Sequence, residues 1–235
     1  MVLARDRFLG AGHYQPVADA LSALAARAFE ARAFEARAFE ARAGQGGPGL
    51  VLDLAGGTGY YLALVLDALD GRLGACVDLS APALRRAARA HPLAAALGAD
   101  AWRHLPFADD SAALVLSVFG PRNPAEIRRV LAPGGTLVVA TPGQDHLTEL
   151  RRTLGLIGID ELKSARLAEA FGDYASAAVA SVRYQLRLGH ADLTDLVAMG
   201  PSARHIGQDA LAGRVAALPD QVTVTVDVEV RSYRG

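Results

Sequence analysis

The sequence predicts an α/β fold, with helices packed on both faces of a doubly wound, mostly parallel sheet. From residue 50 onward, short apolar runs alternate with helical stretches, which is typical of βαβ units. A glycine-rich turn also joins the first of these runs directly to a helix. The chain has 235 residues, 51% of them hydrophobic, which suffices for one sizeable domain. We expect an N-terminal helical segment at residues 1–48 and the main domain at residues 49–235.

The N-terminal segment is rich in helix-forming residues. Alanine, leucine, arginine and glutamate dominate from Gln15 to Ala43, so a long helix is predicted there. The pentad AFEAR occurs three times between Ala28 and Arg42, and successive repeats are rotated by about 140° around a helix. We interpret this repeat as a solvated spacer, with a partner-binding helix as the alternative.

Five apolar runs predict the parallel strands of the sheet: Leu50–Leu54, Leu73–Leu79, Ala94–Gly98, Ala113–Phe119 and Thr136–Thr141. The last part of the chain is predicted to add a strand at Val179–Leu188 and helices at His146–Leu154, Asp160–Phe171 and Ala191–Met199. The run Val222–Val230 alternates strictly between apolar and polar residues, which predicts a strand with one exposed face. An antiparallel strand at a sheet edge would suit this run.

The composition excludes several kinds of protein. A formal charge of -1 gives no argument for nucleic-acid binding, which would need a local basic patch. Cys76 is the only cysteine, so neither a disulfide framework nor a cysteine-rich zinc site is expected, and we predict no metal site. The first residues lack the apolar core of a signal peptide, and no run of about 18 apolar residues occurs. A cytoplasmic protein without a membrane span is expected.

The most informative motif is the glycine loop, which we define as residues 53–59 with the sequence Asp-Leu-Ala-Gly-Gly-Thr-Gly. The loop follows a buried strand and precedes a helix, the context in which such loops bind nucleotides. Its glycines allow positive φ and close approach of a ligand, and the following helix offers free N–H groups. The candidate cofactor-binding residues of this loop are Asp53, Gly56, Gly57, Thr58 and Gly59. A tight βα turn without a ligand is the alternative.

Two acidic residues after the next strands extend this candidate site. Asp78 ends the second strand, where a carboxylate can accept hydrogen bonds from both hydroxyls of a ribose. Asp100 follows the third strand and resembles the acidic residue that members of a nucleotide-binding family place near the adenine amine, and Trp102 could stack nearby. The alternatives are that Asp78 only begins a helix, that Asp100 only stabilises a turn and that Trp102 belongs to the core.

Two motifs distinguish between nucleotide cofactors. The dinucleotide fingerprint needs a third glycine where this chain has Leu62, so an NAD-dependent reductase is disfavoured. The glycine loop instead resembles the D-x-G-x-G-x-G motif of class I S-adenosylmethionine-dependent methyltransferases. The segment Glu126–Gly135, followed by Thr136-Leu-Val-Val, resembles their later helix-turn-strand signature. This resemblance implies a Rossmann-like fold and S-adenosylmethionine as the cofactor.

Five segments together resemble one family more closely, the 23S rRNA (guanine-N1)-methyltransferases of the tylosin-resistance type. They are Leu9–Pro16, Asp53–Gly59, Arg85–Pro92, Val118–Pro124 and Ala140–Leu147. The resemblance implies methyl transfer to N1 of a guanine in a 23S rRNA hairpin that lines the peptide exit tunnel, and hence macrolide resistance. 23S rRNA is therefore the expected partner.

The resemblance also implies further cofactor-binding residues. By matching position, Tyr14 and His146 join Gly56, Gly57 and Asp78 around the cofactor. The alternatives are that Tyr14 only packs the first helix onto the sheet and that His146 only caps a helix.

The chain departs from the family pattern in the zinc module, in the AFEAR repeat and at Ala55. The family normally opens with a small zinc module that grips RNA, and the sequence begins where that module would end, so its ligands are lacking. Ala55 stands where the motif has glycine, which is tolerable unless φ there is positive.

The target base is expected to meet the methyl group at the segment Phe119–Asn123, after the fourth strand. Arg122 could contact a phosphate or base edge, and Asn123 could hydrogen-bond the guanine or, alternatively, cap the next helix. No general base is identified, so the catalytic residues stay unknown. Two other functions remain open: a small-molecule methyltransferase of an antibiotic pathway, and an inactive homologue that only binds the cofactor. The oligomeric state does not follow from the sequence, and a homodimer is one possible state.

Overall fold

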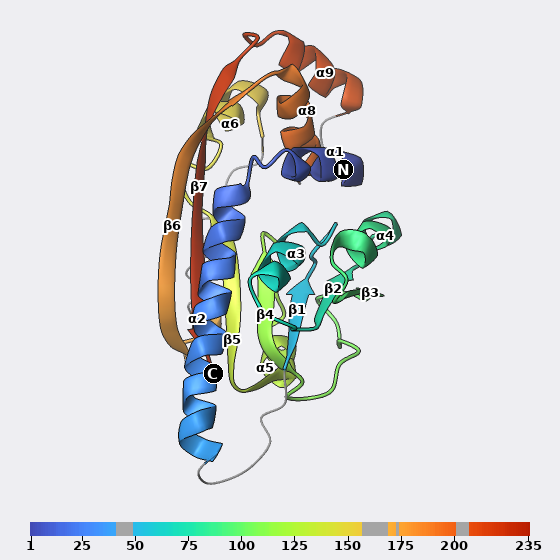
Figure 1. Cartoon of the computed structure of the whole chain (residues 1–235). Coiled ribbons are helices and arrows are strands. Elements are labelled where there is room, and N and C mark those ends of the chain that lie inside the picture. The colour runs from blue at the N-terminus through green and yellow to red at the C-terminus, as the bar shows by residue number, and fades with distance from the viewer. Residues whose placement is uncertain (41–48, 157–168, 173, 201–206) are drawn as a thin grey trace.

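A computed structural model describes residues 1–40, 49–156, 169–172, 174–200 and 207–235, and it shows a twisted sheet covered by helices (Figure 1). Within these residues the sheet has seven strands in the order β3-β2-β1-β4-β5-β7-β6. The strands are β1 Leu50–Leu54, β2 Gly74–Asp78, β3 Ala94–Gly98, β4 Ala112–Val118, β5 Leu131–Pro142, β6 Ala175–Leu188 and β7 Val222–Arg234. The first five are parallel, and β7 runs antiparallel to both of its neighbours.

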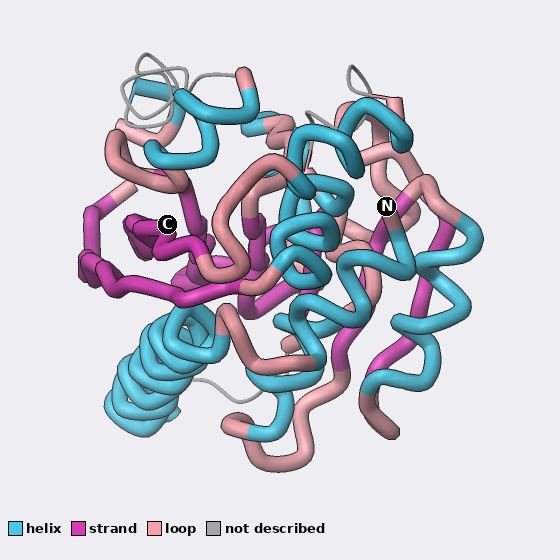
Figure 2. The backbone as a smooth tube through the Cα atoms, turned by 90° about the horizontal axis from the view of Figure 1, so that it is seen from above, coloured by secondary structure: helices cyan, strands magenta, loops and turns pink. Residues whose placement is uncertain are grey.

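The helices lie on both faces of this sheet. They are α1 Val2–Gly10, α2 Gln15–Glu40, α3 Tyr60–Asp67, α4 Ala81–Ala90, α5 Pro124–Val130, α6 Thr148–Leu154, α8 His190–Met199 and α9 Gln208–Ala216. Successive side chains of a strand point to opposite faces of the sheet, so alternate residues belong to two different hydrophobic clusters. Val51 packs on the side of α2 and α3, whereas Leu52 packs on the side of α5. Figure 2 shows the long α2 standing against one face of the sheet.

The predicted strands and the antiparallel C-terminal strand are confirmed, with small changes at their ends. β1 and β3 have the predicted bounds, and β5 begins earlier than predicted, at Leu131. The position of the last strand was wrong: β7 lies between β5 and β6, and β6 forms the edge. Four valines of β7, Val224, Val226, Val228 and Val230, are fully buried because strands flank β7 on both sides and helices cover its inner face.

The predicted helices at His146–Leu154 and Ala191–Met199 are confirmed as α6 and α8. The expected helix at Asp160–Phe171 lies mostly outside the described residues. Two helices, α1 and α9, were not predicted. In α1 the apolar residues do not form one clear stripe, so periodicity gave little signal.

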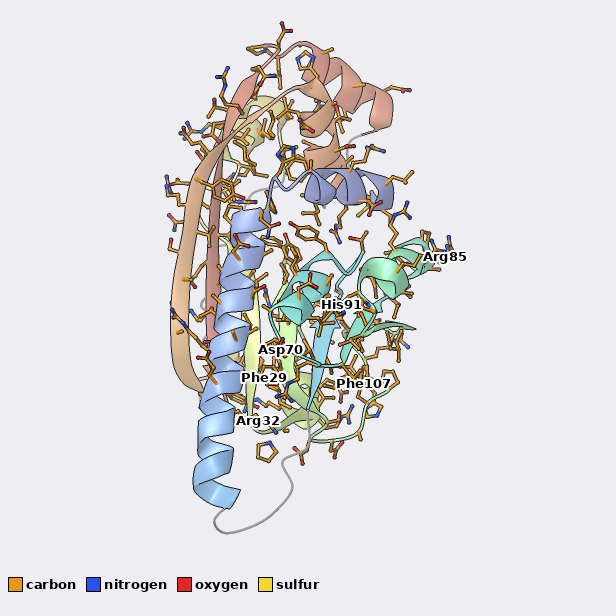
Figure 3. All side chains as sticks on the ribbon, in the orientation of Figure 1. Phe29, Arg32, Asp70, Arg85, His91 and Phe107 are labelled. Atoms are coloured by element: carbon orange, nitrogen blue, oxygen red, sulfur yellow. The ribbon has the colours of Figure 1, made fainter. Side chains whose placement is uncertain are left out.

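The long N-terminal helix packs on the core through its first half. Val17, Leu21 and Ala25 are fully buried against the sheet, at the spacing of one helix face. Farther along, the Phe29 ring lies 4.7 Å from the guanidinium of Arg72, and Figure 3 labels Phe29 on this helix. Most side chains of the AFEAR repeat lie outside the described residues. In the part of the chain that the structure describes, no helix combines the length and apolarity that crossing a membrane requires.

Candidate active site

A cavity of about 570 Å³ opens at the carboxyl ends of β1, β2 and β4. This is the edge at which parallel α/β sheets bind ligands, because the strand-to-helix loops leave a crevice there. Residues from α1, the glycine loop, the β2–α4 turn, the segment after β3 and the segment after β4 line the cavity. Figure 1 shows α1 lying across the carboxyl ends of the first strands.

The glycine loop turns sharply between β1 and α3. Gly57 and Gly59 have φ of +61° and +76°, a conformation that only glycine adopts without strain. Ala55 has φ of +56°, which is a strained conformation for a residue with a Cβ. The glycine found at this position in the related motif would adopt it without strain. Thr58 lines the cavity and is buried. The backbone N–H of Gly57 donates to Asp78 Oδ2 at 2.9 Å, which ties the loop to the end of β2.

Asp53 lies directly beneath this loop and is completely buried. A Cβ at Gly56 would collide with its carboxylate, so this glycine is needed for the loop to pass over it. Neither carboxylate oxygen has a hydrogen-bond partner among the described residues. Burial, together with the neighbouring Asp78, raises the pKa of Asp53 to about 7. Arg5 acts in the opposite direction and lowers this pKa, but no hydrogen bond from the described residues reaches the carboxylate.

Asp78 lies at the cavity wall, and its role as a ribose-binding residue stays a prediction. Its Oδ1 accepts from the backbone N–H of Ser80 at 2.8 Å, and Ser80 in turn caps α4. These bonds fix the carboxylate at the start of α4 and leave it in contact with the cavity. Both interpretations of Asp78, as a helix-start residue and as a cavity residue, are compatible with this geometry.

Asp100 and Trp102 form another wall of the same cavity. Asp100 Oδ1 accepts from the backbone N–H of Trp102 at 3.0 Å, so Asp100 does stabilise a turn. Trp102 is 63% exposed, which is wrong for a core residue and suits a ring that covers a ligand.

Arg5 is a cavity residue that sequence reasoning did not select. It extends from α1 over the glycine loop, and its Nη1 lies 2.5 Å from the position of a Cβ on Gly57. Its Nη2 donates to the carbonyl of Met199 at 3.3 Å. The sequence contained no signal for this placement, because α1 was not predicted and Arg5 lies 52 residues before Gly57 in the chain.

Tyr14, His146 and Phe119 form an aromatic cluster beside the cavity. The Tyr14 hydroxyl lies 3.3 Å from His146 Nε2, and the rings of Phe119 and His146 stack with their centroids 6.1 Å apart. Phe119 also lines the cavity and has φ of +54°, a strained conformation for a residue with a bulky side chain. The structure thus brings the two predicted residues together and connects them to the cavity through Phe119.

The hydrogen bonds of His146 assign its tautomer. The backbone N–H of Asp227 donates to Nδ1 at 3.3 Å, so Nε2 carries the proton of the neutral ring and donates to Tyr14. Burial lowers the pKa of His146 to about 4, so the ring is neutral near pH 7. The Tyr14 hydroxyl, which is almost fully buried, keeps its own proton free to donate. His146 does not cap α6, whose N-cap is Leu147.

Arg122 and Asn123 do not line the cavity. Arg122 is buried, donates to the carbonyl of Ala140 at 3.4 Å and has a pKa lowered by burial to about 10. Asn123 caps α5 by accepting from the N–H of Glu126, and its Nδ2 donates to the carbonyl of Trp102 at 2.9 Å. The structure therefore favours the capping interpretation of Asn123, and it places the Arg122 side chain away from the cavity.

The cavity fits the chemistry of S-adenosylmethionine, the cofactor implied by the sequence motifs. This molecule carries a positive sulfonium and ammonium, a carboxylate, and a ribose with two free hydroxyls. Asp78, Asp100 and Arg5 line the cavity, and the carboxylate of Asp53, which does not line it, is buried nearby without a hydrogen-bond partner among the described residues. Acidic groups outnumber the basic one, which favours a ligand with net positive charge.

Comparison with known proteins agrees with this geometry. Residues 51–135 match a family model described as a methyltransferase domain. A 23S rRNA (guanine(748)-N(1))-methyltransferase of Streptomyces fradiae is 47% identical over 97% of this chain and 77% of that protein. A putative 23S rRNA (guanine-N(1)-)-methyltransferase of Micromonospora griseorubida is 46% identical over 100% of this chain and 79% of that protein.

Among solved structures, the MccD protein has a similar fold. Its TM-score is 0.52 at 17% sequence identity, and the match covers 79% of this chain and 90% of that protein. At this identity the likeness supports the fold alone.

Proposed function

Because the chain belongs to the family of 23S rRNA (guanine-N1)-methyltransferases, we propose that it methylates N1 of a guanine in 23S rRNA. It is an S-adenosylmethionine-dependent methyltransferase of the α/β class. The observation that carries the proposal is the 47% identity to the Streptomyces fradiae enzyme over almost the whole chain. An rRNA substrate would place the reaction in the cytoplasm. Protection of the peptide exit tunnel against tylosin-type macrolides is the biological consequence we propose.

The bound cofactor supplies a methyl group activated by its positively charged sulfur. The chain has to hold the methyl donor, exclude water and align the nucleophile with the methyl group. Such positioning of two reactants can lower the barrier of a displacement substantially. We propose that Asp78 holds the ribose hydroxyls, while Asp100 and Trp102 hold the adenine. Gly56, Gly57, Thr58 and Gly59 allow the cofactor to approach the backbone, and Asp53 offsets its positive charge.

The target guanine is proposed to enter beside Phe119. This residue lines the cavity with a strained backbone, and such strain is retained where a precise position is needed. Tyr14 and His146 hold the Phe119 ring from behind. His146 is not assigned as the base for the N1 proton, because its Nδ1 is occupied by the Asp227 N–H and its Nε2 already carries a proton. The general base stays unassigned.

The proposal is tested by incubating the purified chain, unmodified ribosomal RNA and isotopically labelled S-adenosylmethionine. Nuclease digestion and mass spectrometry should show label in N1-methylguanine from 23S rRNA. The Asp78→Ala variant should show no product, because it removes the proposed ribose ligand. The exposed Arg89→Ala variant on α4 serves as the control that retains activity.

Two outcomes would contradict the proposal. Labelled RNA without N1-methylguanine would show another target atom, and we would then reassign the nucleotide. Cofactor binding without RNA methylation would exclude RNA as the substrate of this chain and favour a small-molecule acceptor. A homodimer stays a prediction, which sedimentation of the same preparation would test.

A further inference from the structure

α1 covers the cavity and is tied to the rest of the chain by its charged residues. Arg7 Nε donates to Asp195 Oδ2 of α8 at 2.7 Å, and Asp6 accepts from Arg86 Nε of α4 at 2.9 Å. These two contacts account for charged side chains on α1 that point away from the cavity. Arg5 is different, because it lines the cavity, and within the described residues its side chain donates only to the backbone carbonyl of Met199.

Arg5 is the only arginine, lysine or histidine among the described residues that line the cavity. No ion pair joins Arg5 to a carboxylate in the part of the chain that the structure describes. Its guanidinium lies over Gly57 and is close enough to the buried Asp53 to lower the pKa of that carboxyl, without forming an ion pair with it. A guanidinium has five donors arranged to grip a carboxylate with two parallel hydrogen bonds.

The cofactor carries one group that the rest of the cavity does not match. Its sulfonium, ammonium and hydroxyls suit the acidic residues that line the cavity, Asp78 and Asp100, whereas its α-carboxylate needs a cationic partner. We propose that Arg5 binds the α-carboxylate of the methionine part of S-adenosylmethionine, so that α1 closes over the bound cofactor. This inference rests on the cofactor assignment and is independent of the RNA target.

Calorimetric titration with two ligands tests the proposal on the full chain. The ligands are S-adenosylmethionine and its decarboxylated form, S-adenosyl-3-methylthiopropylamine, which differ only in the carboxylate. The wild-type chain should bind the first more tightly, by about 10-fold or more, as expected for a hydrogen-bonded charge pair. In Arg5→Ala this preference should disappear, because affinity for S-adenosylmethionine falls while affinity for the decarboxylated ligand does not.

Two further variants separate this role from a general loss of structure. Arg5→Lys keeps the charge without the fork of donors and should retain part of the preference. Arg85→Ala removes an exposed arginine of α4, labelled in Figure 3, and should keep the wild-type preference.

The proposal is overturned if Arg5→Ala weakens both ligands equally, which would mean that Arg5 only supports the fold. It is also overturned if Arg5→Ala leaves both affinities unchanged and lowers RNA methylation alone, since Arg5 would then contact RNA. Failure of the RNA assay leaves this binding test intact, so the two proposals can fail separately.

Discussion

Asp53 combines complete burial with two carboxylate oxygens that have no partner among the described residues. Its pKa rises from an ordinary value of 3.8 to about 7 on folding. The folded chain therefore binds this proton more tightly than the unfolded chain does, and the associated stability is complete below about pH 4. That stability is lost as the pH rises toward 7 and changes little above it.

The Asp53→Asn variant should not lose stability between pH 4 and pH 7, because the amide side chain cannot ionise. We expect the cofactor-free variant to be more stable than wild type at pH 8, by a few kcal/mol at most, since one pKa unit corresponds to about 1.4 kcal/mol. At pH 4 the two should be nearly equally stable. Urea unfolding at both pH values measures the difference, and equal gains at both values would argue against a raised pKa. The same variant should bind S-adenosylmethionine more weakly.

Ala55 has a left-handed backbone at the position where the related motif has glycine. For a residue with a Cβ this conformation costs roughly 1–2 kcal/mol, and glycine loses part of the gain through its greater freedom when unfolded. Ala55→Gly should therefore raise the free energy of unfolding by about 0.5–1 kcal/mol. Ala63→Gly, in the middle of α3, should instead lower it by about 1 kcal/mol. Equal destabilisation by both changes would contradict the strain at Ala55.

His146 should stay neutral across the pH range in which ordinary histidines titrate. Burial lowers its pKa to about 4, and the Asp227 N–H holds the tautomer with the proton on Nε2. Imidazole chemical shifts of labelled protein should show no titration of His146 between pH 8 and pH 5. A midpoint near 6.5 would mean that the ring is hydrated and that the contact with Tyr14 is broken.

At the scale of an element, α1 depends on α8 for its position over the cavity. Asp195 is 8% exposed and bonded to Arg7, so Arg7→Ala leaves a buried carboxylate with one partner fewer. Hydrogen exchange in α1 should become faster in this variant. Cofactor affinity should fall, because α1 would no longer be held in place over the cavity. Arg89→Ala, which removes an exposed arginine of α4, should change neither quantity. Unchanged exchange in Arg7→Ala would show that apolar packing alone holds α1.

The edge strand and the C-terminal strand show why element order is harder to predict than element type. The run Val222–Val230 was assigned correctly as a strand, because strict alternation is a local signal. Its neighbours β5 and β6 are set by pairings over the length of the chain, and no local pattern encodes them. The expectation of an edge position failed for this reason.

At the scale of the whole molecule, the N-terminal helices share one core with the sheet. Phe8, Tyr14 and Leu21 belong to the same buried cluster as Leu116 and Val226. The proposed boundary at residue 48 therefore separates sequence segments that pack together. We expect a fragment of residues 49–235 to lose cooperative unfolding, because it exposes the apolar surface that α1 and α2 cover. Calorimetry of the fragment and the full chain measures this, and a sharp transition in the fragment would show an independent domain.

The sequence by itself determined the fold class, the approximate positions of the strands and the glycine loop, and the resemblance of its motifs to class I methyltransferases implied the cofactor. These features depend on local signals: a period of two, a glycine turn between strand and helix, and an acidic residue at the end of the next strand. Ala55 was recognised as a departure, and only the structure showed that its φ is positive.

Only the tertiary structure decided which distant residues meet at the cavity. It placed Arg5 over Gly57 and brought Tyr14 to His146, 132 residues later in the chain. It also turned Arg122 into the protein interior and used Asn123 as a helix cap. Side-chain direction at the end of a strand depends on the packing of neighbouring strands and helices, which long-range contacts establish and a local pattern does not contain.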